Sequence, residues 1–299
     1  MTLLSLPAEL HEQIANFLVP TVRDLSCLSR SCSHLHANIN WLLYDTCAKY
    51  DFVAKNALAY AVEAADEGLL ERLAAVKAPL NTPFQGNRRP LHLAALDGKL
   101  GLVRKLLQLY GREAAHEAYF EPPFSPLYYA ARNGHWPIVF LLAEIPPPAD
   151  KDRQSYLADG LKFAAAQGNL DVVRVLLEQY HVNVNHLSQQ SAMRENKPTA
   201  LYAAVETGDV PMIELLLAAG ADPNLHPVWS FIPLHGAVKR QNAEIVQLLL
   251  DAGADRNALD ILDRTPLTHA ISLKLSSPGS DNLDLVVSLL SSRSATLAR

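Results

Sequence analysis

A short pattern recurs along this 299-residue chain at a spacing close to 33 residues. Its clearest copies read Pro-Leu-His-Leu-Ala-Ala at 90–95 and Pro-Leu-His-Gly-Ala at 233–237. The leucines that anchor the copies are Leu58, Leu91, Leu127, Leu161, Leu201, Leu234 and Leu267, which are 33, 36, 34, 40, 33 and 33 residues apart. A period in this range predicts stacked supersecondary units, each of which buries its apolar face only against its neighbours.

Two further features share the register of the anchors. An aliphatic cluster begins eleven residues after each of the first six anchors, and within it Ile245, Leu248 and Leu249 follow helical spacing. Glycines stand seven residues after four anchors, at Gly98, Gly134, Gly168 and Gly208. Each unit is therefore predicted to be a short helix, a glycine-assisted turn and a second, amphipathic helix. Small residues after the anchors, such as Ala94 and Ala130, are expected where helices of adjacent units approach closely.

The pattern resembles the ankyrin repeat family, whose period is 33 residues and whose signature includes Thr-Pro-Leu-His-x-Ala. Residues 265–270 show that signature with Thr268 at the histidine position, and the resemblance covers about 57–292. It implies an all-α solenoid of about seven repeats over 51–299. The repeats are expected near 56–84, 89–122, 125–157, 159–188, 199–228, 232–261 and 265–295. The resemblance also implies that His92 and His235 tie neighbouring turns by hydrogen bonds and have no catalytic role.

Residues 1–50 do not fit the repeat and are predicted to form three short helices. Leu-Pro-Ala-Glu-Leu at 6–10 is followed by apolar landmarks whose order resembles the F-box over about 4–45. This resemblance implies docking on the linker subunit of an SCF-type, cullin-based ubiquitin ligase. The docking face would be formed or supported by Leu6, Pro7, Leu10, Ile14, Leu25, Leu28 and Trp41. The alternative is that these helices only cap the solenoid.

Residues that could carry chemistry do not form a recognisable set. Cys27, Cys32, His34 and His36 have ligand side chains, but their spacing differs from that of zinc sites, and Cys32 falls on an apolar helix face. Phosphate-binding loops, nucleophile elbows and kinase motifs do not occur. The sequence therefore predicts no catalytic residue, no metal site and no cofactor, so the chain is expected not to be an enzyme.

Charge and hydropathy limit the partners. A net charge of −5 argues against a surface built to neutralise nucleic-acid phosphates. No run of 18 apolar residues is present, which predicts no membrane span. The start lacks the features of a signal peptide, and three cysteines do not make a disulfide framework. An intracellular location, in cytoplasm or nucleus, is expected.

The connections between repeats, called fingers, are the predicted partner-binding surface. Aromatic residues on exposed turns are enriched among binding hot spots. The finger aromatics are Trp229, Phe231, Phe124 and Phe84, and Trp136 and Arg240 are second-rank candidates on the turns between helices. The alternative is that the aromatics fold back onto the adjoining repeat.

The predicted function is that of an adaptor that holds an unidentified protein substrate for ubiquitin transfer by other subunits. The alternative function is an ankyrin scaffold or regulator without a ligase role.

Overall fold

The computed structural model describes residues 51–75, 89–112, 114, 124–147, 153–186, 199–225, 232–276 and 281–292. Within these residues the regular elements are fourteen α-helices. The segment 1–50, with all seven predicted docking residues and the cysteine–histidine group, lies outside the described residues.

The helices form seven consecutive pairs. The first helices of the pairs are α4 (Asp51–Ala64), α6 (Pro90–Leu96), α8 (Pro126–Arg132), α10 (Arg153–Ala166), α12 (Ala200–Thr207), α14 (Pro233–Lys239) and α16 (Pro266–Ser276). The second helices are α5 (Glu67–Ala75), α7 (Leu100–Tyr110), α9 (Trp136–Ala143), α11 (Leu170–Glu178), α13 (Val210–Ala218), α15 (Ala243–Asp251) and α17 (Asp281–Ser291).

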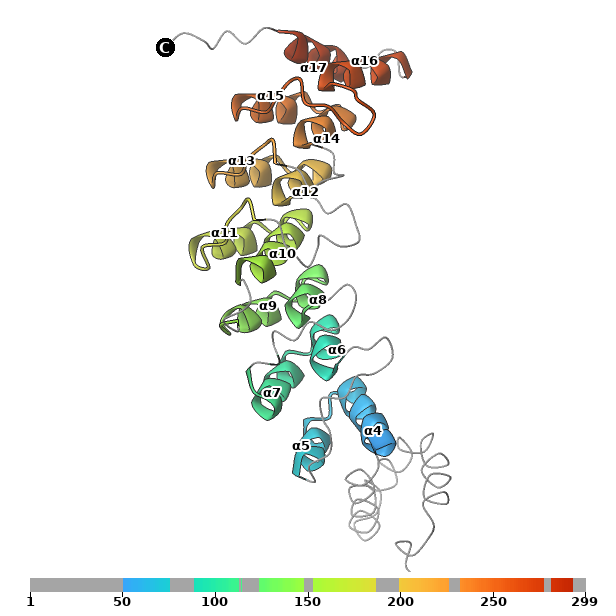
Figure 1. Cartoon of the computed structure of the whole chain (residues 1–299), viewed down its shortest axis with the longest axis vertical. Coiled ribbons are helices and arrows are strands. Elements are labelled where there is room, and N and C mark those ends of the chain that lie inside the picture. Colours follow the sequence, from blue (N-terminus) through green and yellow to red (C-terminus); the bar gives the residue numbers. More distant parts are fainter. Residues whose placement is uncertain are drawn as a thin grey trace, which may run out of the picture.

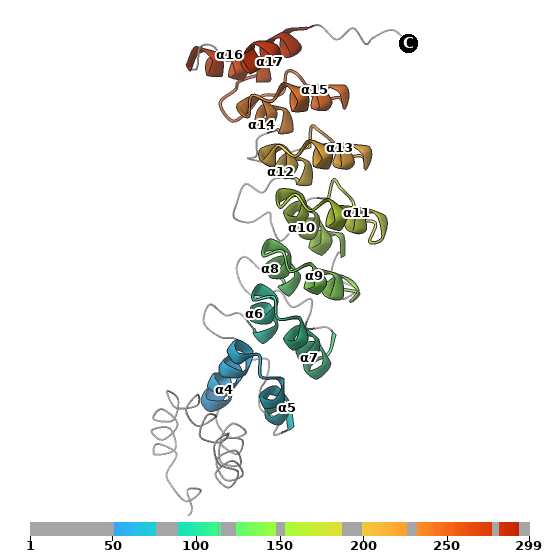
Figure 2. The ribbon, with the colours of Figure 1, turned by 180° about the vertical axis from the view of Figure 1, so that it is seen from behind.

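The pairs stack in one direction to make an elongated solenoid (Figures 1 and 2). First helices pack on first helices, as α10 does on α8 and α12, and second helices such as α15 pack on α13 and α17. The all-α repeat architecture that the sequence predicted is therefore confirmed for the described part of the chain.

Proline decides where several first helices begin. Pro90, Pro126, Pro233 and Pro266 each occupy the first position of a helix, where the fixed φ angle suits the helix and the residue before proline is biased to extended backbone. The helices α4 and α10 have no proline at this position. They begin at Asp51 and Arg153, several residues before the expected repeat starts near 56 and 159.

The turn within each of the first six pairs uses left-handed backbone, and in four of them the residue is the glycine that the sequence pattern indicated. Gly98 has a φ of 73° and Gly208 a φ of 79°. At the equivalent position after α14 the chain has Gln241, which adopts a φ of 57°. The next helix is then capped by a side chain in several repeats, for example Asp209, whose carboxylate accepts from the backbone N–H of Met212 at 3.1 Å.

The core runs continuously through the stack, with leucine, valine and isoleucine from both helices of each pair. Ala94, Ala130 and Ala164 are fully buried, and Ala203 is buried too, which agrees with close approach of adjacent first helices. Among the described helices, none is both long and apolar enough to cross a membrane.

Candidate interaction surface

Of the four aromatic residues predicted in the fingers, only Phe124 lies within the described residues. Trp229, Phe231 and Phe84 lie outside the described residues. Phe124 is half-buried, and its ring stacks on that of Tyr128 with centroids 4.0 Å apart and planes 17° apart. The ring of Tyr128 in turn meets that of Phe163 edge-on at 5.2 Å. Part of Phe124 is therefore held against its own repeat, and its role in partner binding stays a prediction.

The turns between helices carry polar side chains that bond to the preceding repeat. Arg240 donates from Nη1 to the carbonyl of Glu206 and from Nη2 to that of Thr207 at 3.2 Å. Lys99, His135 and Gln167 make the corresponding contacts to carbonyls of the repeat before their own. Arg240 thus ties two repeats together, a role that the sequence interpretation did not foresee.

Trp136 begins α9 at the same edge of the stack, directly after His135. Its indole is half-buried and packs against the core. Any partner contact of Trp136 therefore involves only the exposed part of the ring, and it stays a prediction.

The signature histidine of α14 behaves as the family resemblance implied. The ring Nε2 of His235 lies 2.9 Å from the carbonyl oxygen of Ala258, in the finger that follows α15. Because a carbonyl only accepts, this contact makes Nε2 the protonated nitrogen and leaves Nδ1 with the lone pair. His92, at the same position in α6, is buried and meets the ring of Tyr129 edge-on at 6.1 Å.

The finger formed by residues 258–264 is the most completely described connection, and we call it the last finger. Its backbone closes on itself, because Asp260 N–H donates to the carbonyl of Arg264 and Asp263 N–H donates to that of Asp260, both at 3.0 Å. Asp263 adopts a φ of 54°, a left-handed conformation that aspartate tolerates better than most residues.

The carboxylate of Asp260 organises the last finger from within. Its Oδ1 accepts from the backbone N–H of Leu262 at 2.8 Å and of Arg264 at 3.0 Å. Its Oδ2 accepts from Nε and Nη2 of Arg264 at 2.9 and 2.8 Å. The side chain of Asp260 is fully buried. Burial alone would raise its pKa, but these hydrogen bonds outweigh burial and lower the pKa to about 2.

Around this buried carboxylate the last finger exposes three large aliphatic side chains. Leu259, Ile261 and Leu262 are 56%, 60% and 62% exposed. Exposed apolar side chains are common singly, but three within four residues on an internally bonded loop make a patch that fits protein contact. We call these three residues the fingertip. These residues were not among the predicted binding residues, which in the fingers were all aromatic, although an aliphatic run in a normally polar finger was the available signal.

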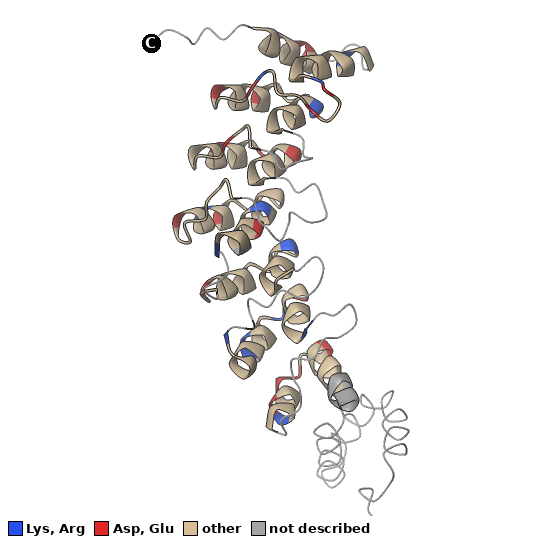
Figure 3. Ribbon diagram, in the orientation of Figure 1, with Lys and Arg blue, Asp and Glu red and all other residues tan. Residues whose placement is uncertain are grey.

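Charged side chains of one sign do not gather on one face of the described repeats. Lysines and arginines occur together with aspartates and glutamates along the described repeats (Figure 3). Near the fingertip the Arg264 guanidinium is neutralised by Asp260. Apolar contact at the fingertip is therefore the clearest binding feature of the described surface.

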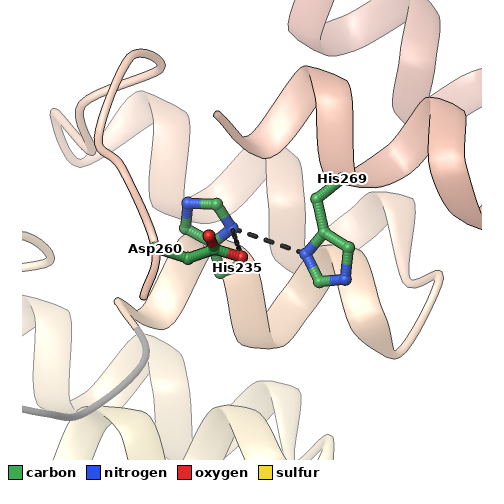
Figure 4. A group of neighbouring side chains, drawn as sticks. All are labelled: His235, Asp260 and His269. Atoms are coloured by element: carbon green, nitrogen blue, oxygen red, sulfur yellow. Dashed lines mark hydrogen bonds and ion pairs between the residues drawn. The ribbon is translucent and has the colours of Figure 1, made fainter. Parts of the chain in front are cut away.

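A compact group of buried polar side chains lies beneath the last finger (Figure 4). His235 from α14, Asp260 from the finger and His269 from α16 are all buried, and one ligand atom from each lies within 4.8 Å of the others. The Nδ1 atoms of the two histidines are 3.4 Å apart. Burial lowers the pKa of both histidines from the usual value, and the charge of Arg264 lowers that of His269 further. Both imidazoles are therefore neutral near pH 7.

The sequence matches the family model described as ankyrin repeats (3 copies) over 91–188, 127–227 and 201–296. These matches together span 91–296 and do not reach the predicted F-box-like segment.

Two curated relatives match parts of the chain. The human transient receptor potential cation channel subfamily A member 1 is 29% identical over 48% of this chain and 12% of its own length. The mouse ankyrin repeat and SOCS box protein 14 is 34% identical over 34% of this chain and 18% of its own length. The chain thus spans less than a fifth of either relative.

Two crystal structures share the fold. The ankyrin repeat domain of human ASB11 has a TM-score of 0.55 at 24% identity, and that of Bcl-3, described as a unique member of the IkappaB protein family, has 0.56 at 21%. Each match covers 78% of this chain and 96% of the other.

Proposed function

The chain belongs to the ankyrin repeat family, and from that premise we propose that it is a protein-binding adaptor without catalytic activity of its own. Repeat solenoids present extended surfaces to partners and carry no built-in reaction chemistry. The observation that supports binding here is the fingertip, three exposed aliphatic side chains on a loop that a buried carboxylate holds in shape. Its apolar character suits a protein partner with a complementary apolar pocket.

We further propose that the bound protein is a substrate for ubiquitin transfer and that residues 1–50 dock an SCF-type ligase through its linker subunit. The support is the ordered F-box-like pattern in the sequence, joined to an ankyrin repeat domain, a fold suited to protein binding. A relative whose name records a SOCS box beside ankyrin repeats shows that such repeats occur with a second module.

The docking proposal is tested with the full chain and purified linker subunit. Leu10→Glu combined with Ile14→Glu places two charges on the predicted apolar face and is expected to abolish binding. Glu12→Lys changes charge on the opposite side of the same predicted helix and serves as the matched control. Binding by the double variant equal to the unaltered chain, with the helical circular dichroism of both unchanged, would contradict the assignment.

The fingertip is tested in the same full chain by quantitative affinity purification. Leu259→Ser, Ile261→Ser and Leu262→Ser together are expected to remove substrate proteins while linker-subunit binding is retained. The matched control is Leu275→Ser, which changes a more exposed leucine, 80% exposed, at the end of α16. Equal recovery of every protein with both variants would exclude the fingertip as the binding surface.

The second candidate function is a scaffold in which residues 1–50 only cap the first repeat. It predicts that deleting 1–50 lowers the stability of the solenoid while the unaltered chain shows no affinity for the linker subunit. The two functions are therefore separated by the same deletion and one binding measurement.

A further inference from the structure

The group beneath the last finger has the composition and spacing of a metal site. His235 on α14, Asp260 on the last finger and His269 on α16 are 25 and 9 residues apart in sequence. Stacking of the last two repeats brings them together. His235 Nδ1 is 3.4 Å from His269 Nδ1 and 4.0 Å from Asp260 Oδ2. Ligands at about 2.1 Å from a tetrahedral Zn²⁺ lie about 3.4 Å from each other. The histidine pair already has this separation. The carboxylate has to move about 0.6 Å closer to His235, and also closer to His269, since the three ligand atoms lie within 4.8 Å of one another.

The protonation of His235 prepares it for coordination. Its Nε2–H donates to the carbonyl of Ala258, so the Nδ1 lone pair is directed toward Asp260 and His269 (Figure 4). Metal-bound histidines are commonly oriented in this way, with the second ring nitrogen donating to a backbone carbonyl. The contact therefore selects the tautomer and the ring orientation that a metal ligand requires.

His269 contacts His235 through the two Nδ1 atoms, which are 3.4 Å apart. Because His235 Nδ1 is unprotonated, this contact is a hydrogen bond only when His269 Nδ1 carries the proton. A metal ion between the rings replaces that shared proton. His269 then coordinates through Nδ1 and carries its proton on Nε2, so the neutral imidazole changes tautomer with no net proton release.

We propose that His235, Asp260 and His269 bind one Zn²⁺ ion, with water as the fourth ligand. Two imidazoles and one carboxylate suit zinc, whereas Mg²⁺ and Ca²⁺ prefer sites made of oxygen ligands. Arg264 donates two hydrogen bonds to Asp260 Oδ2. Binding of the ion by Oδ2 would replace one of them, and the other would still orient the carboxylate, although the positive charge of Arg264 weakens the attraction for the ion. The bound ion would join α14, α16 and the base of the last finger.

The sequence interpretation predicted no metal site because these residues follow no ligand motif. His269 stands one position after Thr268, which takes the usual histidine position in that repeat. Because His269 lies one residue beyond the signature position, its imidazole meets that of His235, the signature histidine of the preceding repeat.

The proposal is tested on the full chain after dialysis against EDTA. Titration with Zn²⁺ is expected to show one equivalent bound at submicromolar affinity and a rise in Tm of about 2 °C or more at saturating metal. His269→Asn keeps a donor toward His235 but removes the imidazole, and it is expected to weaken binding at least about tenfold. His181→Asn, the same change at an exposed histidine, is expected to leave the affinity unchanged.

Spectroscopy on the unaltered chain keeps the proposal testable if a variant does not fold. Zinc-edge X-ray absorption is expected to show nitrogen and oxygen neighbours without sulfur, which excludes the cysteines of the first fifty residues. Sulfur ligation, absence of binding, or equal affinity in folded His269→Asn would each overturn the proposal.

Discussion

Asp260→Asn is the substitution that tests most directly how the last finger is held. The change leaves the size of the side chain nearly the same but removes the charge that accepts both Nε and Nη2 of Arg264. The amide must also keep its one oxygen toward the backbone N–H groups of Leu262 and Arg264, which turns its NH₂ group toward the guanidinium. Two donors then face each other in a buried position, so the finger should open more often.

Two quantities indicate how much stability the finger loses in Asp260→Asn. The pKa of Asp260 falls from 3.8 to about 2, which corresponds to roughly 2 kcal/mol favouring the charged form in the folded chain. Removing one partner of a buried ion pair costs about 3–5 kcal/mol. The loss should fall below that range because the side chain of Arg264 is 31% exposed and can turn to water. We expect a local loss of about 2 kcal/mol.

Hydrogen exchange of the full chain in EDTA measures this loss where it occurs. A loss of about 2 kcal/mol increases the open population of the finger about 30-fold, so amides of 258–264 should exchange about 30-fold faster. Asp263→Asn is the matched control, since the same change at an exposed left-handed position on the same loop should alter exchange little. Unchanged exchange in Asp260→Asn, or equal acceleration in both variants, would refute the reasoning.

Two further predictions concern the stack, and both are measured by urea unfolding of the full chain. Gly98→Ala should destabilise by about 1–3 kcal/mol, because φ is 73° and the new Cβ would lie 2.6 Å from the ring of His135. Gly220→Ala, at a φ of 86° with no atom within 4 Å, should lose less, and equal losses would argue against the steric contribution. Ala204→Leu should cost about 1–3 kcal/mol, since Ala204 is fully buried on α12, which packs between α10 and α14. Ala218→Leu on an exposed position of α13 should be nearly neutral, and a comparable loss there would contradict the packing argument.

Much of the fold could be predicted because its signals are local. Proline at 90, 126, 233 and 266 marks the first position of a helix, and glycine at 98 and 208 marks left-handed turns. Both restrict the backbone through sterics of the residue itself, so they need no knowledge of distant contacts. Before α10 this local signal is missing, and the helix begins at Arg153, ahead of the expected repeat start near 159.

The candidate site was much less predictable. Trp136 and Arg240 were chosen by position, but whether a turn side chain faces a partner or bonds to the preceding repeat depends on stacking, which local sequence does not report. The fingertip depended on which side chains Asp260 leaves exposed when it turns inward. The first outcome is decided by contacts between repeats and the second by hydrogen bonds within the folded finger.

The sequence by itself determined that the chain is a stack of helix pairs, because a 33-residue period with anchored leucines, small residues and turn glycines allows burial only between neighbouring copies. Only the tertiary structure decided what the last two repeats place together. His235, Asp260 and His269 become neighbours because α14 and α16 stack and the buried side chain of Asp260 lies close to both histidines. A periodic sequence predicts each repeat separately, whereas a site shared by two repeats arises from the packing that joins them.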